Sequence, residues 1–242
     1  MTEHRTPRTP RTVELPGLSL AYRESGPADG PPLVLLHALG ERAADWEPVL
    51  PALAPHHRVL ALDQRGHGDS ARPGHYGLEA MRDDVLAFLD ALGLPMADLV
   101  GHSMGGAVAY LVAQERPERV GRLVLEDVPV PRPRPASPVA DAPDGPVDFD
   151  WAAVRAVKEQ IDRPDPRWLE RMAAITAPTL LVAGGAASHV PQAGLAELAG
   201  LIADCRLVTI EAGHLVHLAR PAEFVAAVAP FLDPAGRDDR AG

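Results

Sequence analysis

The chain has 242 residues, 46% of them hydrophobic, and a formal net charge of −10 at pH 7. This composition suits one globular domain of ordinary size, and no stretch approaches the roughly 18 apolar residues that a membrane span needs. The acidic balance disfavours nucleic acid as a partner, and the single cysteine, Cys205, excludes an internal disulfide and fits a cytoplasmic location.

Short apolar runs alternate with helical patterns along the chain. Residues 1–12 form a polar, basic segment without the apolar centre of a secretory signal, and we expect a disordered tail there. Residues 13–15 and 18–22 flank a Pro-Gly turn and predict a hairpin. The elements expected next are strands 33–36 and 59–62, helix 78–92, strand 97–100, helix 107–113, strands 120–125 and 179–183, helix 193–203, strand 206–210 and helix 221–232. This order predicts the α/β class, a mainly parallel sheet with helices on both faces, followed by a second tail over 233–242.

One segment, residues 129–175, interrupts the alternation. Its first part is rich in proline and its second part predicts two short helices. Trp151 and Trp168 lie in those helices, and exposed indoles are unfavourable. We therefore expect a lid or cap over the carboxyl edge of the sheet, inserted between core segments 13–128 and 176–232, and consider a solvated linker the alternative.

The pentapeptide Gly101-His102-Ser103-Met104-Gly105 follows a predicted strand and opens a predicted helix. This is the G-x-S-x-G motif in the strand–turn–helix context that gives it meaning. The sharp turn forces the serine into strained backbone geometry and requires very small flanking residues. Ser103 is therefore the predicted nucleophile, and a turn with a capping serine is the alternative.

A serine nucleophile needs a base, and His214 lies just past the last predicted strand, where the loop returns to the carboxyl edge of the sheet. His217 lies three residues further on, where it either lines the site or is an ordinary packed or solvated histidine. The chain order, with the serine before the histidine, fits the order Ser, acid, His.

The third member of the triad is harder to place. The loop after strand 179–183, where an acid is expected, contains no carboxylate. Asp127, at the end of the preceding strand, lies beside the strand of the nucleophile and is the predicted acid. Glu126 is a weaker candidate, because strand alternation points it to the other face. A polar substitute such as Ser188, or no acid at all, is the remaining possibility.

An oxyanion needs two N–H donors. The N–H of Met104, the residue after the nucleophile, is the first predicted donor. The second is expected in the loop after the first core strand, and we assign it to the N–H of Leu39.

Taken together, these motifs resemble the α/β-hydrolase fold family over nearly the whole chain, residues 13–232. The segments that carry the resemblance are His37-Ala38-Leu39-Gly40, Asp63-Gln64-Arg65-Gly66-His67-Gly68-Asp69-Ser70, the pentapeptide around Ser103, and Gly213-His214 with Pro221 and Phe224 downstream. The resemblance implies a hydrolase of esters or related carbonyl compounds with no cofactor or metal, in which residues 63–70 buttress the site.

Two departures from the family pattern stand out. Ala38 replaces the usual glycine, and the acid has moved to Asp127, as in some haloalkane dehalogenase relatives. Serine at the nucleophile position argues against dehalogenase and epoxide hydrolase chemistry, which use an aspartate in this fold.

The expected function is that of a cytoplasmic carboxylesterase-like serine hydrolase acting on a small molecule, with no nucleic acid or membrane partner. The pattern leaves the substrate and the oligomeric state open. The residues proposed to line the substrate pocket are His37, Ala38, His102, Trp151, Trp168 and His217. A hydrolase of carbon–carbon bonds in diketone-like ring-cleavage products shares the triad and is the main alternative, ahead of a perhydrolase. A low-turnover small-molecule receptor is the alternative outside enzymes.

Overall fold

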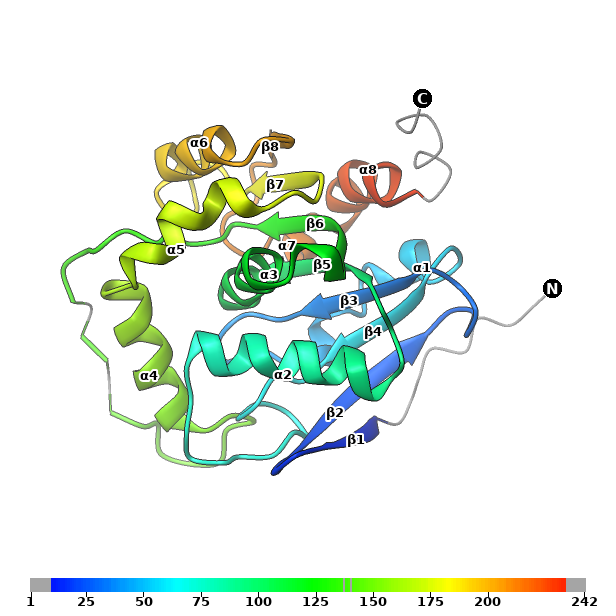
Figure 1. The fold of residues 1–242 in the computed structure, drawn as a ribbon. Coiled ribbons are helices and arrows are strands. Elements are labelled where there is room, and N and C mark those ends of the chain that lie inside the picture. The colour runs from blue at the N-terminus through cyan, green and yellow to red at the C-terminus, as the bar shows by residue number, and fades with distance from the viewer. Residues whose placement is uncertain (1–9, 137, 140, 234–242) are drawn as a thin grey trace.

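The computed structural model describes residues 10–136, 138–139 and 141–233, and in this part of the chain eight strands form one sheet (Figure 1). The strands are β1 (Arg11–Leu15), β2 (Leu18–Ser25), β3 (Pro32–Leu36), β4 (Arg58–Leu62), β5 (Ala97–His102), β6 (Val120–Glu126), β7 (Thr179–Ala183) and β8 (Cys205–Thr209). Their order across the sheet is β1-β2-β4-β3-β5-β6-β7-β8. The pairs β1–β2 and β2–β4 are antiparallel and the remaining pairs are parallel, which confirms the expected fold class.

Helices connect the parallel strands. They are α1 (Leu50–Leu53), α2 (Leu78–Ala91), α3 (Met104–Glu115), α4 (Trp151–Asp162), α5 (Pro166–Glu170), α6 (Gln192–Leu201), α7 (Val216–Ala219) and α8 (Pro221–Leu232), with the short 3₁₀ segments η1 (Ala43–Trp46), η2 (Pro117–Arg119) and η3 (Arg171–Ala174). Sequence patterns missed η1, α1 and α7, because a single turn is too short to show helical periodicity.

The sheet separates two hydrophobic cores, and alternate side chains along each strand point into one core or the other. From β3, Val34 and Leu36 enter the core beneath α2, α3 and α6, whereas Leu33 and Leu35 enter the core beneath α1 and α8. Strand β4 divides its residues in the same way. Because these strands are buried on both faces, they appear in the sequence as continuous apolar runs.

The order of the strands positions the site. From β3 the chain crosses to β4 on one side, and it then returns to β5 on the other side of β3. The connections therefore diverge at the carboxyl ends of β3 and β5, and such a switch point is where open α/β sheets bind ligands. The loops that carry Leu39 and Ser103 follow these two strands.

The insertion lies beyond the carboxyl ends of the central strands, where α4 is seen at the left of Figure 1. It is tied to the loop after β4 by hydrogen bonds from the N–H of Gly68 to the carbonyl of Asp148 and from the N–H of Asp150 to the carbonyl of Gly66, both 2.7 Å. Gln160 of α4 also accepts a hydrogen bond from the N–H of Leu78 at the start of α2, over 2.6 Å. These contacts place the segment against the loops that surround the switch point.

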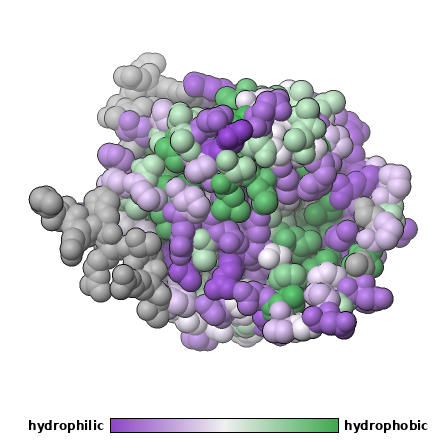
Figure 2. Space-filling model, turned by 180° about the vertical axis from the view of Figure 1, so that it is seen from behind, coloured by the Kyte–Doolittle hydropathy of each residue, from purple (hydrophilic) through white to green (hydrophobic). Residues whose placement is uncertain are grey.

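The termini differ in part from expectation. Residues 11 and 12 belong to β1 and pair with β2, so the ordered chain begins earlier than predicted, because backbone pairing with Tyr22 and Ala21 holds them. The rest of the two predicted tails, residues 1–9 and 234–242, lies outside the described residues. Among the helices described, none is long and apolar enough to cross a membrane. On the face shown in Figure 2, hydrophobic and hydrophilic side chains are interspersed.

Candidate active site

Ser103 occupies the sharp turn between β5 and α3. Its backbone has φ 50° and ψ −112°, a conformation that L-residues rarely adopt and that requires support from its surroundings. A side chain on Gly105 would collide with the carbonyl oxygens of Leu36 and His37, and one on Gly101 would collide with the carbonyl of Gly105. Glycine at both positions thus lets the start of α3 close onto β3. Ser103 is partly exposed although both of its neighbours are buried.

His214 and Asp127 form the next contact. Nδ1 of His214 lies 2.7 Å from Oδ2 of Asp127, although 87 positions separate them in the chain. Asp127 is fully buried and has φ 42°, so it is the second non-glycine residue with a positive φ among those described. The strain at Ser103 and Asp127 places both side chains at the same edge of the sheet.

The carboxylate of Asp127 is held by four groups. Oδ1 accepts hydrogen bonds from the N–H of Gly184 at 2.9 Å and from Nε2 of Gln192 at 3.2 Å, and Oδ2 accepts from the hydroxyl of Ser188 as well as from His214. Burial alone would raise the pKa of Asp127, but these hydrogen bonds, led by the one from His214, lower it below its usual value. Asp127 is therefore ionised at neutral pH, and it fixes the His214 tautomer that carries its proton on Nδ1.

The loop after β7 supports this acid. Gly184 donates its N–H to Asp127, and a side chain on Gly184 would overlap the carbonyl of Gly213. Ser188, considered above as a substitute for the acid, donates to Asp127 instead. Glu126 points the other way, as strand alternation predicts, and accepts hydrogen bonds from the N–H and Nδ1 of His217, both at 2.9 Å.

The loop after β3 lies across β5 from the acid. The N–H of Ala38 donates to Oε2 of Glu41 at 3.0 Å, and the N–H of Gly40 donates to Nε2 of His67 at 3.2 Å. Within the described part of the chain, the N–H of Leu39 donates no hydrogen bond. It is therefore a candidate donor to a ligand.

The loop over residues 63–70 buttresses this arrangement. Oδ1 of Asp63 accepts a hydrogen bond from the N–H of Ala43 at 2.6 Å, which ties the end of β4 to η1. Arg65 forms a bidentate ion pair with Asp84 of α2, with both N–O distances at 2.5 Å. Since Nε2 of His67 accepts the hydrogen bond from Gly40, residues 63–70 connect the loop after β3 to the body of the domain.

Aromatic residues of the insertion pack against the loop after β3, Phe149 directly and Trp151 through Phe149. Phe149 occupies the space in front of Gly40, 3.5 Å from where a side chain on that glycine would begin. The ring of Phe149 stacks on His67 and on Trp151, with centroids 6.0 and 5.9 Å apart. Trp151 is partly exposed, as a pocket residue would be. Phe149 was not predicted, because nothing in its local sequence marks its contact with Gly40.

The other five predicted pocket residues are buried: His37, Ala38, His102, Trp168 and His217. Their place in a substrate pocket stays a prediction, and several of them take part in contacts within the protein. For example, Nε2 of His37 accepts a hydrogen bond from the N–H of Gln64 at 3.0 Å, and burial lowers the pKa of His37 to about 3, so it is a neutral structural residue. Trp168 is 6% exposed and packs in the core beside Met172, and its carbonyl accepts a hydrogen bond from Gln114 of α3.

Sequence reasoning also missed His189, which lies beside His214. The ring of His189 lies 4.1 Å from the ring of His214, centroid to centroid, and burial followed by the charge of His214 lowers the pKa of His189. The signal for His189 was its place beside Ser188, in the loop where an acid was expected. Nε2 of His102, on the other side, lies 2.8 Å from the carbonyl oxygen of His214.

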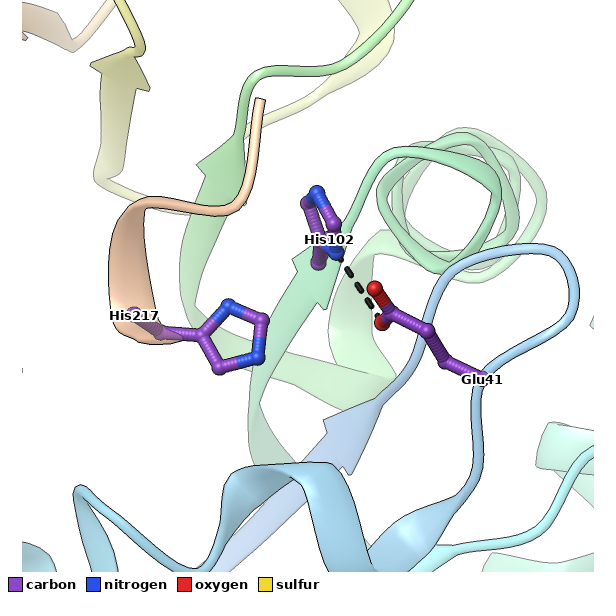
Figure 3. Close-up of side chains that lie close together, drawn as sticks. All are labelled: Glu41, His102 and His217. Carbon is purple, nitrogen blue, oxygen red and sulfur yellow. Dashed lines mark hydrogen bonds and ion pairs between the residues drawn. The ribbon is translucent and has the colours of Figure 1, made fainter. Parts of the chain in front are cut away.

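A second polar cluster lies beneath the site (Figure 3). Glu41, His102 and His217 each present a donor atom within 4.8 Å of the others. Residues of these types can hold a transition metal. In this structure, however, both ring nitrogens of His102 are engaged in hydrogen bonds, Nδ1 with Glu41 at 3.1 Å and Nε2 with His214. The side chains of His102 and His217 are fully buried.

Known proteins resemble the chain in both sequence and structure. A model of the family described as alpha/beta hydrolase fold matches residues 31–153. A crystal structure of a hydrolase from Pseudomonas aeruginosa PA01 superposes with a TM-score of 0.80 and 31% identity, covering 93% of this chain and 98% of the other.

Two curated relatives illustrate the range of activities. The sn-1-specific diacylglycerol lipase ABHD11 of Mus musculus is 28% identical over 275 residues, covering 91% of this chain and 87% of the relative. A 2-hydroxymuconate semialdehyde hydrolase of Pseudomonas sp. (strain CF600) is 39% identical over 125 residues, covering 50% of this chain and 44% of the relative. Two further relatives, each 45% identical, are matched over only 32% and 42% of their own length.

Proposed function

Since this chain belongs to the α/β-hydrolase fold family, we propose that it is a serine hydrolase that cleaves a small-molecule carboxylic ester through an acyl-enzyme on Ser103. The observation that carries the proposal is the 2.7 Å hydrogen bond between Nδ1 of His214 and the buried Asp127, at the edge of the sheet where the strained Ser103 is presented. A nucleophile, a base and a group that orients the base are the parts that such chemistry needs.

The proposed first step is attack of the Ser103 hydroxyl oxygen on the ester carbonyl. Nε2 of His214 takes the hydroxyl proton as the new C–O bond forms, and Asp127 stabilises the resulting imidazolium. The tetrahedral intermediate then collapses, the bond to the alcohol oxygen breaks, and His214 returns the proton to the departing alcohol. A water molecule, deprotonated by His214, attacks the acyl-enzyme in the same manner and releases the acid.

The proposed oxyanion donors are the N–H groups of Leu39 and Met104. Ala38 and Gly40 use their N–H groups within the protein, which leaves that of Leu39 for the substrate. Met104 begins α3, and the first N–H groups of a helix have no partner within the helix. Two such donors, held in place before substrate arrives, stabilise the charge that develops on the carbonyl oxygen.

Burst kinetics and covalent labelling test this proposal. A chromogenic ester should give a rapid release of one equivalent of alcohol per protein before the steady state, and an organophosphonate should label Ser103. Activity should be insensitive to EDTA. The proposal fails if the label falls on another residue, or if a chelator abolishes turnover and a divalent ion restores it. A receptor on the same fold would bind esters without sustained turnover.

The similarity to the semialdehyde hydrolase supports a second candidate function, the hydrolysis of a carbon–carbon bond in a diketone-like ring-cleavage product. The same triad would serve, with a carbanion in place of an alcohol as the leaving group. A panel of esters of varied acyl length and ring content, run beside such diketones, separates the two. A kcat/KM that is higher for diketones by a factor of 100 or so, about 2.7 kcal/mol of transition-state stabilisation, would favour the second candidate.

A further inference from the structure

Below the proposed triad, His102 bridges two loops that carry catalytic groups. His102 is the second residue of the G-x-S-x-G turn and lies at the end of β5. Its Nδ1 is 3.1 Å from Oε2 of Glu41, in the loop after β3, and its Nε2 is 2.8 Å from the carbonyl oxygen of His214, in the loop after β8. The dashed line in Figure 3 marks the contact with Glu41.

Both partners of His102 are hydrogen-bond acceptors. A carboxylate oxygen and a carbonyl oxygen have no proton to offer, so both ring nitrogens must donate and the ring is an imidazolium. The electrostatics agree: burial opposes the charge, but the carboxylates of Glu126 and Glu41 and the two hydrogen bonds raise the pKa of His102 to about 9. Burial likewise opposes charge on Glu41, yet its contacts with His102 and with the N–H of Ala38 lower the pKa of Glu41 to about 2.

Glu41 connects this bridge to the loop after β3, residues 37–41, called the oxyanion loop here because it carries the proposed donor Leu39. The oxygen that accepts from His102, Oε2, also accepts the N–H of Ala38 at 3.0 Å, one residue before the proposed donor Leu39. One carboxylate oxygen therefore sets the path of the oxyanion loop and anchors the histidine that holds the backbone of His214.

A second contact fixes the same loop three residues later. Glu126 accepts hydrogen bonds from the N–H and Nδ1 of His217, and the ring of His217 stacks on Trp46 with centroids 4.2 Å apart. The backbone of this loop is thus tied to the sheet at His214 and again at His217. Among the residues that the structure describes, Nε2 of His217 has no hydrogen-bond partner.

We propose that Glu41 and His102 are positioning residues for the reaction proposed above, a charged pair that holds the oxyanion loop and the loop of the catalytic base at a fixed separation around Ser103. Glu41 acts through His102 and Ala38, and His102 holds the carbonyl of His214 while its ring lies 4.6 Å from the ring of His214, centroid to centroid. The predicted effect on catalysis rests on the proposed function. The bridge between the two loops does not depend on which bond the enzyme cleaves.

The test compares kcat, KM and the rate of Ser103 phosphonylation in Glu41→Ala, His102→Ala and the double variant. Each single change should lower kcat by ten- to a hundredfold, as small misplacements of catalytic groups do, with KM changed less than about threefold. Because the two residues form one device, the double variant should fall no further than the worse single variant. Glu41→Gln should restore only part of kcat, since an amide oxygen in the place of Oε2 can accept from Ala38 and His102 but lacks the charge that keeps His102 an imidazolium.

His57→Ala is the matched control. His57 is also buried and lies just before β4. Its ring nitrogens lie 3.2 Å from the carbonyl oxygen of Leu53, at the end of α1, and 3.1 Å from that of Leu232, at the end of α8. That position is at the amino end of the strands, away from the loops of the site. The change should lower stability and leave kcat close to that of the parent.

Nitrogen-15 NMR of the histidine rings gives a readout that does not require turnover. Both ring nitrogens of His102 should be protonated at neutral pH, and the signal of the Nδ1–H of His214 should shift in Glu41→Ala and His102→Ala but not in His57→Ala. If the proposed function fails, Ser103 is not labelled in the parent, while these signals still report on the bridge. Three results would overturn the inference. The first is a neutral His102, and the second is a loss of kcat in the double variant equal to the product of the two single losses. The third is a stoichiometric metal in the purified protein that Glu41→Ala removes.

Discussion

Oδ2 of Asp127 lies 2.7 Å from Nδ1 of His214, and the acid comes from the end of β6 while the loop after β7 contributes supporting donors. The backbone conformation of Asp127, with φ 42°, turns its side chain toward the edge of the sheet. The neighbouring Glu126 retains the strand conformation and enters the cluster around His217. Adjacent carboxylates thus serve different histidines.

Asp127→Asn should lower kcat by roughly 10⁴, because an amide donates to Nδ1 of His214 and favours the wrong tautomer. Steady-state kinetics with a chromogenic ester measures the effect, and circular dichroism checks that the fold is retained. Glu126→Gln is the matched control and should cost far less. Comparable losses in the two variants, or a larger loss for Glu126→Gln, would place the acid elsewhere.

Ser103→Ala should abolish burst release of alcohol and lower kcat by about 10⁴ or more, the scale on which triad knockouts act. Mass spectrometry after treatment with an organophosphonate should find the label on Ser103 in the parent and no label in the variant. Ser19→Ala, on β2, serves as a control and should leave both measurements unchanged. Residual activity within about tenfold of the parent would rule out Ser103 as the nucleophile.

The sequence predicted those parts of the site that local patterns carry. Ser103 lies in a turn with its own signature, and His214 follows a strand whose apolar run is plain in the sequence. Asp127 followed from the absence of any carboxylate in the loop after 179–183. Each inference needed only a few neighbouring residues and the alternation of strands and helices.

The remainder of the site depends on contacts between residues far apart in the chain. Glu41 and His102 are separated by 61 positions, and nothing near Glu41 distinguishes it from a solvated glutamate. The contact of Phe149 with Gly40 likewise exists only once the insertion has docked. Burial is equally hidden from local patterns, since a histidine that lines a pocket and one that packs in a core look alike in the sequence.

Stability should depend on pH through the buried His102. Its pKa is raised from an unfolded value near 6.5 to about 9, so the stabilisation is fully present below about pH 6.5 and is lost as the pH rises through 9. The expected loss is about 3 kcal/mol in the free energy of unfolding. Urea unfolding of the parent and of His102→Gln at about pH 6 and about pH 10 measures this loss. The variant lacks the contribution of His102, so the difference in unfolding free energy between the two proteins removes the effect of the other titrating groups. A stability difference between the two proteins that is independent of pH would contradict the ionised pair.

The insertion should divide into a structural part and a part that selects substrates. Trp168 is in the core beside Met172, so Trp168→Ala should lower the free energy of unfolding by about 3–5 kcal/mol and shift selectivity among acyl groups little. The sequence placed Trp168 in the substrate pocket, and a large shift in selectivity with little loss of stability would support that place.

Phe149 and Trp151 should instead carry selectivity. Phe149 covers Gly40 beside the proposed donor Leu39, and Trp151 stacks on its other side and is partly exposed. An acyl group that binds at the oxyanion loop would therefore meet these rings. Trp151→Ala should change the ratio of kcat/KM between short and long acyl esters by about tenfold or more, the scale of one to three kcal/mol that apolar contacts contribute to discrimination.

The two variants control for each other. Phosphonylation of Ser103 by a very small phosphonate should proceed at nearly the parental rate in Trp151→Ala, since that reagent does not reach the rings. Thermal unfolding of the same variant should shift less than that of Trp168→Ala, because the partly exposed indole of Trp151 loses less buried area. A uniform fall in rate for every ester in Trp151→Ala, together with a large drop in Tm, would show that this end of the insertion is also core and that selectivity arises elsewhere.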